Sequence, residues 1–319
     1  MIFLVQLGTI DYATGLALQQ QLVALRKEAK IADVLLLLEH SPVITLGRNA
    51  KAANVVASRD LLAQRGIELF ECDRGGDVTF HGPGQIVGYP IFDLRGYART
   101  QTNPSSSPNP SPLSSRAKEN DSLANRSLQS RDLGVTEERP STIRKTLGVI
   151  EFVRRLEEVV IRTCADFAVP AKRIAGLTGV WTDPETSQHK KTLSFRAEQE
   201  DSLANLPAES RNLLSAGATT HPESKLAAIG VHVSRFVTSH GFALNVNTDL
   251  SYFSLIVPCG ITSKPVTSMK QELGRPLDLT AVAESISRNF GVVFQSQILW
   301  LESLDALLAS SDHCSTVTH

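Results

Sequence analysis

The sequence has almost no net charge, few cysteines and no long hydrophobic run. Its 32 basic and 33 acidic residues leave a formal net charge of −1, so no basic field is present for a phosphate backbone and nucleic-acid binding is not expected. The four cysteines, Cys72, Cys164, Cys259 and Cys314, have no metal-ligand spacing and are too few for a disulfide framework. We therefore expect reduced thiols and no bound metal.

Export and membrane-spanning signals are also missing. The N-terminus, "MIFLVQLGTIDYATGLALQQQ", has no basic n-region, and the apolar run "VLLLLEH" is far too short to span a bilayer. We expect a cytoplasmic protein that does not associate with membranes. At 319 residues, 42% of them hydrophobic, the chain can bury a sizeable core.

Two polar segments, about 100–142 and 184–221, interrupt this globular pattern. Both are rich in Ser, Pro and Asn or in charged residues, a composition that cannot offset the entropy of ordering. They also carry a repeat, because 116–133 aligns without gaps on 196–213 with ten of eighteen positions identical. We interpret them as duplicated surface inserts in a single catalytic domain spanning 1–319; a partner-binding motif that orders on contact is the alternative.

The remaining sequence predicts an α/β protein. Apolar spacing predicts helices over 11–29 and 146–168, "DVLLLLEH" predicts a buried strand, and "KLAAIGVHVS" and "GFALNVNTDL" alternate like paired strands. Strands outnumber long helices and do not alternate strictly with them. This favours a mixed sheet flanked by helices, of α+β type, over a doubly wound parallel sheet.

The stretch "DRGGDVTFHGPGQ" at 73–85 has an unusual density of glycine. It matches neither the GxGxxG dinucleotide pattern nor a phosphate-binding loop. It does supply two glycines after Arg74, a strand-like "DVTF" and His81 at the turn "HGPG". Either this is a plain glycine-rich hairpin, or its backbone passes close to a ligand.

A possible nucleophile lies in "VPCGI" at 257–261. A cysteine between proline and glycine is expected at a turn, where its sulfur can be exposed. Cys164 instead fits a small buried hydrophobe, Cys72 ends a strand beside the Arg74 loop, and Cys314 has no evident role. Cys259 is therefore the best candidate, although a thiol of ordinary pKa needs a nearby cation or base.

The segments "EHSPVITLGR", "RGGDVTFHGPGQIVGYPIFDL", "KLAAIGVHVSRFVTSHGFALNVNTDL" and "PCGI" occur in this order. Together they resemble the octanoyltransferases of lipoate biosynthesis, the lipoate-protein ligase B family, over nearly the whole chain outside the inserts. The resemblance implies the α/β fold shared by lipoate and biotin protein ligases. It implies transfer of an octanoyl group from octanoyl-acyl carrier protein to a lysine of lipoyl domains, in 2-oxoacid dehydrogenase E2 subunits and the glycine-cleavage H protein, the first step of endogenous protein lipoylation.

The resemblance also implies which residues act. Cys259 corresponds to the cysteine that carries the acyl thioester, and Lys225 to its partner lysine. The second insert ends just before Lys225, which is a departure from the family pattern. The residues implied to bind the acyl substrate are Arg74, Gly75, Gly76, Asp77, Val78, Thr79, Phe80, His81, Ala228, Ile229, Gly230, Gly241, Phe242 and Ala243.

This assignment is chemically consistent. A Lys225 cation near Cys259 would favour the thiolate and could carry a proton between the sulfur and the incoming amine. No ATP, metal or other cofactor is needed, and we expect a monomer. The role of His81 stays open between orienting the cysteine, binding substrate and bracing the loop.

Two alternatives remain. An ATP-dependent lipoate-protein ligase of the same fold would have no need for Cys259, so a Cys259→Ser variant separates it from a transferase. A non-catalytic lipoyl-domain-binding protein would show no turnover at all.

Overall fold

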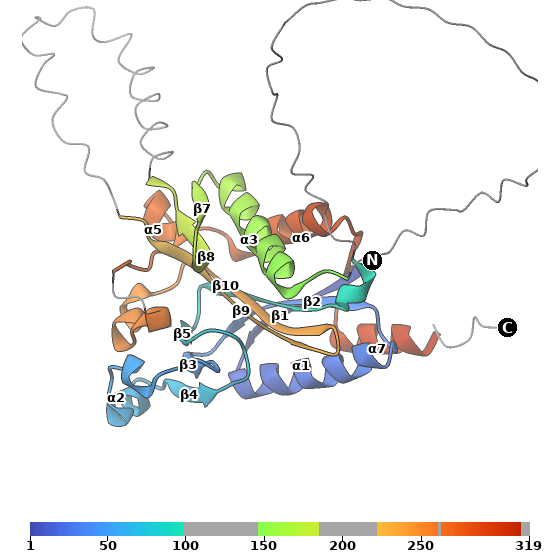
Figure 1. The fold of residues 1–319 in the computed structure, drawn as a ribbon, viewed down its shortest axis with the longest axis horizontal. Helices are drawn as coiled ribbons and strands as arrows, with labels where there is room; N and C mark the ends of the chain where they lie inside the picture. The colour runs from blue at the N-terminus through green and yellow to red at the C-terminus, as the bar shows by residue number, and fades with distance from the viewer. Residues whose placement is uncertain (98–145, 185–221, 261–262, 314–319) are drawn as a thin grey trace, which may run out of the picture.

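The computed structural model describes residues 1–97, 146–184, 222–260 and 263–313 (Figure 1). The predicted inserts at about 100–142 and 184–221 lie outside these residues, apart from residue 184, so their passive role stays a prediction. Within the described ranges, no helix is both long enough and apolar enough to cross a membrane.

An eight-stranded mixed sheet forms the centre of the molecule, in the order β11-β1-β2-β6-β10-β9-β8-β7. β1 pairs in parallel with β2 and β11, and the other pairs are antiparallel. This confirms the predicted mixed sheet. The strands are β1 Ile2–Ile10, β2 Asp33–His40, β6 Gln85–Ile91, β7 Ala171–Ile174, β8 Leu177–Thr182, β9 Lys225–Ser234, β10 Val237–Asn245 and β11 Ile298–Leu301.

A second, smaller sheet has three strands in the order β4-β3-β5. These are β4 Glu68–Glu71, β3 Val43–Leu46 and β5 Val78–His81, and β5 is buried along its whole length. Apolar side chains of this small sheet pack with α2 (Arg59–Gln64) and with the 3₁₀ segment η5 (Leu250–Leu255), and together they form a separate hydrophobic cluster. The small sheet thereby places β5 beside the large one (Figure 1).

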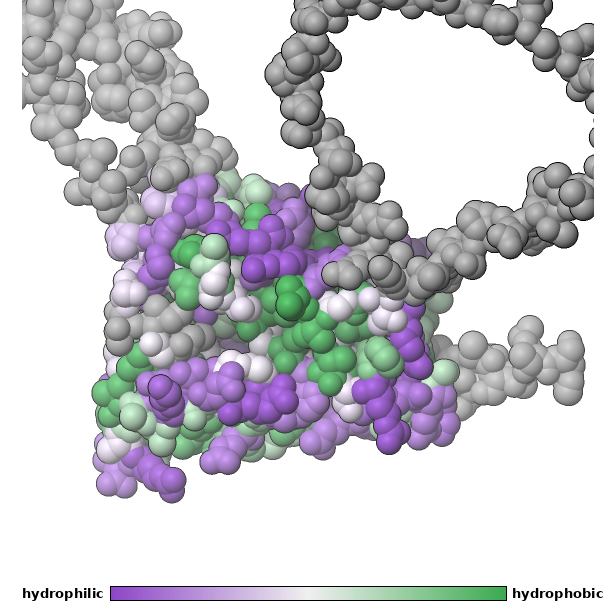
Figure 2. Space-filling view, viewed as in Figure 1, coloured by the Kyte–Doolittle hydropathy of each residue, from purple (hydrophilic) through white to green (hydrophobic). Residues whose placement is uncertain are grey.

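Helices cover both faces of the large sheet (Figure 1). α3 (Val149–Asp166) and α6 (Leu279–Phe294) bury an aromatic-rich core against one face, and α1 (Tyr12–Lys27) covers the other. The shorter helices are α5 Met269–Leu273 and α7 Leu304–His313, and the other 3₁₀ turns are η1 Ala52–Asn54, η2 Leu94–Gly96 and η6 Pro258–Gly260. Apolar side chains gather over the middle of one face, between hydrophilic bands (Figure 2).

Element ends differ from the sequence prediction where local caps decide them. α1 begins after Asp11, whose carboxylate accepts the Thr14 N–H at 2.8 Å, as an N-cap does. The strand predicted over 241–250 instead runs from Val237 to Asn245. It ends at Asn245 because the next two N–H groups, of Val246 and Asn247, both donate to the Gly84 carbonyl, at 3.2 and 2.8 Å, instead of continuing the ladder.

Candidate active site

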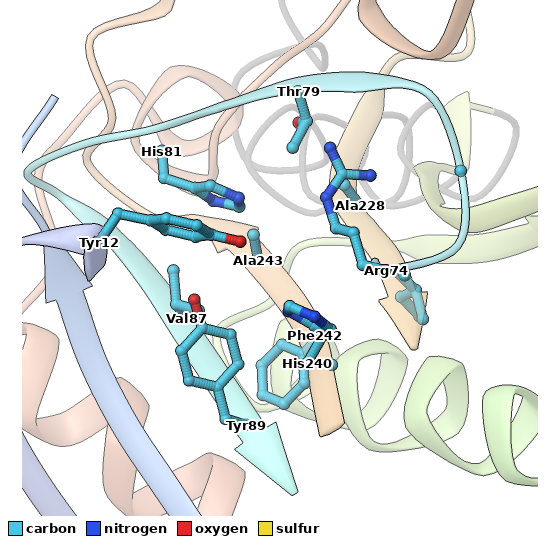
Figure 3. Close-up of a pocket in the computed structure, with 14 residues that line it drawn as sticks. Tyr12, Arg74, Thr79, His81, Val87, Tyr89, Ala228, His240, Phe242 and Ala243 are labelled. Carbon is cyan, nitrogen blue, oxygen red and sulfur yellow. The ribbon is translucent and has the colours of Figure 1, made fainter. Parts of the chain in front are cut away.

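A cavity lies between β5 of the small sheet and strands β6, β9 and β10 of the large one (Figure 3). It encloses about 460 Å³ of space not filled by atoms, part of it open to solvent. Its wall is mostly apolar. The residues that line it are Tyr12, Arg74, Gly76, Thr79, His81, Val87, Tyr89, Ala228, Ile229, Gly230, His240, Gly241, Phe242 and Ala243.

Most of the predicted substrate-binding residues line this cavity, namely Arg74, Gly76, Thr79, His81, Ala228, Ile229, Gly230, Gly241, Phe242 and Ala243. Gly75, Asp77, Val78 and Phe80 do not. Strand alternation separates the members of β5, because successive residues point to opposite faces. Val78 and Phe80 face away, into the hydrophobic cluster with Leu62 of α2.

Four lining residues were not predicted: Tyr12, Val87, Tyr89 and His240. Strand alternation does not identify His240, because its φ of +56° interrupts the regular strand and Phe242, two residues on, packs into the core under α3 and α6. Val87 and Tyr89 lie two apart on β6 and both face α1, so the period of two along this strand is a signal that could have identified them together. For Tyr12, the first residue of α1, the sequence carries no such signal.

The glycine-rich loop packs backbone against backbone. The Gly75 N–H donates to the Val231 carbonyl of β9 at 3.1 Å. A Cβ added at Gly230 would lie 2.6 Å from the Gly75 oxygen, and one added at Gly47 would lie 2.5 Å from the Gly76 oxygen. The glycines therefore allow this loop to lie between β9 and the Gly47 turn, and only Gly76 of the pair also faces the cavity.

Arg74 is held inside this loop. Its side chain is only 8% exposed, and its Nη2 donates to the Thr45 carbonyl oxygen at 2.8 Å and to Thr45 Oγ1 at 2.9 Å. Its Nη1 donates to the Gly75 oxygen at 3.1 Å. All these acceptors are neutral oxygens, so none of them offsets the positive charge that the guanidinium brings to the cavity wall.

His81 is braced by a chain of buried polar groups. Its Nδ1 lies 2.8 Å from Gln85 Oε1, while Gln85 Nε2 donates to Asn245 Oδ1 at 2.8 Å. Nδ1 must therefore carry the proton and donate it to Gln85, leaving Nε2 as an acceptor 3.4 Å from Thr45 Oγ1. Burial lowers the pKa of His81 to about 3, so the ring is neutral at pH 7. This geometry favours bracing of the loop over proton transfer.

Part of the cavity wall consists of the polar rings of Tyr12, Tyr89 and His240 (Figure 3). Tyr89 donates its hydroxyl to Nε2 of His40 at 2.6 Å, because His40 Nδ1 lies 3.1 Å from the Ile10 carbonyl and carries the proton. Burial lowers the pKa of His40 to about 4. His240 Nε2 lies 2.7 Å from a carboxylate oxygen of Asp73. Within the described residues, the buried hydroxyl of Tyr12 has no hydrogen-bond partner.

Lys225 lies in an adjoining hollow of about 270 Å³. This hollow shares the lining residues Thr79, Ala228 and Ala243 with the larger cavity, so the two spaces lie side by side. Pro258, the first residue of η6, also lines it. Lys225 and the turn that carries Cys259 therefore meet at one end of the apolar cavity.

The backbone explains why they meet. The Lys225 N–H donates to the Pro265 carbonyl at 2.8 Å, and the Thr267 N–H donates to the Lys225 carbonyl at 3.0 Å. The segment that follows η6 is thus paired directly with the first residue of β9. The side chain of Cys259 lies outside what the structure describes, so its role stays a prediction.

Asp77 supports this turn rather than lining the cavity. Its carboxylate accepts from Asn54 Nδ2 at 2.5 Å and from the Lys51 N–H at 3.2 Å. The Asn54 carbonyl in turn accepts the Val257 N–H at 2.7 Å, just before η6. A Cβ added at Gly260 would lie 3.0 Å from the same carboxylate. Asp77 therefore links the glycine-rich loop to the Cys259 turn.

The other described cysteines are not placed for catalysis in this cavity. Cys164 is fully buried in α3, as expected, and burial raises the pKa of its thiol to about 12. Cys72 is partly buried, and its Sγ donates to the Leu46 carbonyl at 3.4 Å. Among the residues of known placement, no group of three His, Cys, Asp or Glu side chains could hold a metal ion.

Sequence comparison places this geometry among known proteins. A model of the lipoyl protein ligase A/B catalytic domain matches residues 11–106 and 134–291. An octanoyltransferase of Koribacter versatilis is 49% identical over 98% of this chain and 92% of its own length. One of Acidobacterium capsulatum is 44% identical over 96% and 95%, respectively.

Structural comparison gives the same fold. A putative lipoate protein ligase of Thermoplasma acidophilum superposes with a TM-score of 0.52 at 11% identity, covering 97% of this chain and 92% of its own. A lipoate-protein ligase A bound with ATP has a TM-score of 0.52 at 10% identity, with coverages of 98% and 92%. At such low identity these neighbours show the fold alone.

Proposed function

Because this chain belongs to the lipoyl protein ligase A/B catalytic-domain family and transfers octanoyl groups in protein lipoylation, we propose that it does so through a thioester on Cys259. The donor in this proposal is octanoyl-acyl carrier protein. The acceptors are lysines of lipoyl domains in 2-oxoacid dehydrogenase E2 subunits and of the glycine-cleavage H protein. No ATP or metal takes part.

One observation carries this proposal. Lys225 and Pro258 line one hollow that adjoins the mostly apolar cavity and shares three of its lining residues. An octanoyl chain in that cavity would have its carbonyl carbon at the junction, between an ammonium group and the turn of Cys259. A positive charge close to a thiol favours the thiolate, which is the reactive nucleophile.

The reaction then has two balanced steps. In the first, the Cys259 thiolate attacks the donor carbonyl, the new C–S bond forms, and the carrier's thiolate leaves and takes a proton from Lys225. In the second, the acceptor amine attacks the octanoyl-Cys259 thioester, the amide C–N bond forms, and Cys259 leaves as thiolate. The neutral Lys225 takes up the proton that the amine loses, which restores the starting state.

His81 and Arg74 have supporting roles in this scheme. The neutral, buried ring of His81 keeps β5 beside the junction, through Gln85 and Asn245. Arg74 keeps a positive charge at the cavity wall, where it stabilises negative charge that develops on the thioester carbonyl. Lys225→Arg is expected to lose most of the transferase activity, since a guanidinium keeps the positive charge but does not release a proton at neutral pH.

The test is intact-mass spectrometry after incubation with octanoyl-acyl carrier protein, followed by peptide mapping. We expect one octanoyl adduct, on Cys259, that hydroxylamine removes. Cys259→Ser should abolish the adduct and the transfer, whereas Cys72→Ser, the matched control, should keep both. An adduct on Cys72, or full transfer by Cys259→Ser, would overturn the thioester mechanism.

The ATP-dependent ligase of the same fold is the weaker alternative. The relatives that share 44–49% identity are octanoyltransferases, whereas the ligases share only the fold, at 10–11% identity. Transfer from free octanoate that requires ATP would favour the ligase. We also propose that the enzyme works as a cytoplasmic monomer, which cell fractionation and light scattering will measure.

A further inference from the structure

Lys225 lies at an irregularity in the pairing of β8 with β9. Val180 pairs with Ala227, but the next residue of β8, Trp181, pairs with Lys225. Leu226 is therefore one residue too many on β9, which is a β-bulge. Bulges often redirect a side chain beside an active site.

The bulge decides which way Lys225 points. In a regular strand, residues three positions apart face opposite sides of the sheet. Lys225 and Ala228 are three apart, yet both line the same hollow. Leu226 and Ala227 between them both belong to the hydrophobic core. The extra residue thus turns Lys225 from the core side to the cavity side.

Gly179, on the neighbouring strand β8, makes room for the redirected side chain. A Cβ at this position would lie 2.9 Å from Cε of Lys225 and 2.6 Å from the Ala227 carbonyl oxygen. The glycine also has φ of +125°, which other residues rarely adopt. The stem of Lys225 therefore passes over a position where only glycine fits.

A buried carboxylate on α3 holds this glycine. Glu157 has no exposed surface, and its Oε1 accepts the Gly179 N–H at 3.1 Å. Its Oε2 accepts from Arg154 at 2.6 Å and from Arg173 at 3.1 Å. Three donors thus converge on one buried carboxylate, in the helix that packs against β8 and β9. A buried carboxylate destabilises the fold unless its oxygens accept hydrogen bonds of this kind.

We propose that Glu157 and Gly179 are positioning residues for Lys225. Glu157 fixes the backbone of β8 at Gly179, and Gly179 leaves the space through which Lys225 reaches the junction of the two hollows. Neither residue lines the substrate cavity, so both act through the lysine. The inference rests on the catalytic role proposed above for Lys225.

The first test compares two glycines of β8 and its preceding turn. Gly179→Ala should slow octanoylation of Cys259 at least tenfold, with the KM for octanoyl-acyl carrier protein within twofold of the parent. Gly176→Ala is the matched control, because Gly176 also has a positive φ, +79°, but no atom in the described part of the chain lies within 4 Å of its added Cβ. It should acylate at the parent rate, although backbone strain lowers its melting temperature.

The second test keeps Gly179 and changes only the side chain that holds it. Glu157→Gln retains one acceptor oxygen for three donors, so at least one donor loses its partner, and we expect a three- to thirtyfold slower acylation. Glu158→Gln is the control, because Glu158 is its neighbour on α3 and pairs with Arg173 at 2.8 Å but not with Gly179. It should react at the parent rate. These variants decide the question even if Gly179→Ala does not fold.

A double-mutant cycle separates positioning from a general structural effect. In a Lys225→Met background, where single-turnover acylation is slow but measurable by mass, Glu157→Gln should cause no further loss. If Glu157→Gln slows the Lys225→Met enzyme by the same factor as the parent, or if it leaves the parent rate unchanged, the inference is wrong while the proposed function stands. If Lys225→Met itself acylates at the parent rate, both the role of Lys225 and this inference fall.

Discussion

The close approach at Gly230 gives a quantitative prediction for the glycine-rich loop. In Gly230→Ala, the new Cβ would lie 2.6 Å from the Gly75 oxygen, against about 3.4 Å for an ordinary contact. The loop must therefore move by about 0.8 Å, which strains the bond from the Gly75 N–H to Val231 at 3.1 Å. Overpacking of this kind costs roughly 1–3 kcal/mol.

For a protein of this size, each kcal/mol lowers the melting temperature by roughly 2–4 °C, so calorimetry should show a decrease of roughly 2–12 °C. Because Arg74 and Gly76 move with the loop, acylation of Cys259 should also slow. Gly230 has no positive φ, so strain of its own backbone does not confuse the result.

Gly96→Ala is the matched control for this prediction. No atom of the residues that the structure describes lies within 4 Å of a Cβ added there, and its φ is not positive. It should melt within about 1 °C of the parent and acylate normally. A Gly230→Ala enzyme that matched Gly96→Ala in both measurements would refute the reasoning that glycine is required because the two backbones touch.

Two further predictions concern pH and the inserts. His40 and His81 are buried and neutral, with pKa values lowered to about 4 and about 3 from an ordinary 6.5. As the pH falls, the unfolded state takes up protons on these histidines before the folded state does. Urea denaturation should therefore show a free energy of unfolding that is highest above pH 6.5 and decreases below it, by up to roughly 1.4 kcal/mol per pH unit for each histidine. His81→Gln should reduce this slope, and an unchanged slope would show that His81 is not buried as a neutral ring. Replacing either insert, about 100–142 or 184–221, by a short Gly/Ser linker should preserve the acyl-enzyme, because the chain on the two sides of each insert is already held together. The Leu147 N–H donates to the Leu94 carbonyl at 3.2 Å across the first insert, and the Thr182 N–H donates to the Ser224 carbonyl at 2.8 Å across the second. Loss of acylation in a folded variant would argue against passive inserts, and loss of transfer alone would favour the partner-binding alternative.

Much of the fold follows from local sequence. The alternation in 225–234 and the apolar run in 33–40 predict strands that the structure contains, with helices near both predicted positions. The mixed sheet was predictable because strands and helices do not alternate strictly along the chain. Caps such as Asp11 moved element ends, since a single side chain decides them.

Much of the cavity also follows from the sequence, because its walls are short continuous motifs. Once 74–81, 228–230 and 241–243 are recognised as one site, strand alternation alone separates Thr79, which faces the cavity, from Phe80, which does not. Tyr12 could not be found this way. It comes from a helix whose path across the sheet depends on packing between distant segments.

The direction in which the Lys225 side chain points was decided only by tertiary structure. A regular strand would have directed its side chain away from Ala228, and no local pattern signals the bulge that reverses it. The bulge depends on β8, and Gly179 of that strand is held by Glu157 of α3, twenty-two residues away. Sequence alone indicates the residues that we propose to carry the chemistry, because residue types and motif order are local properties. Their orientation depends on contacts between separate elements, which exist only once the sheet and its covering helices have packed together.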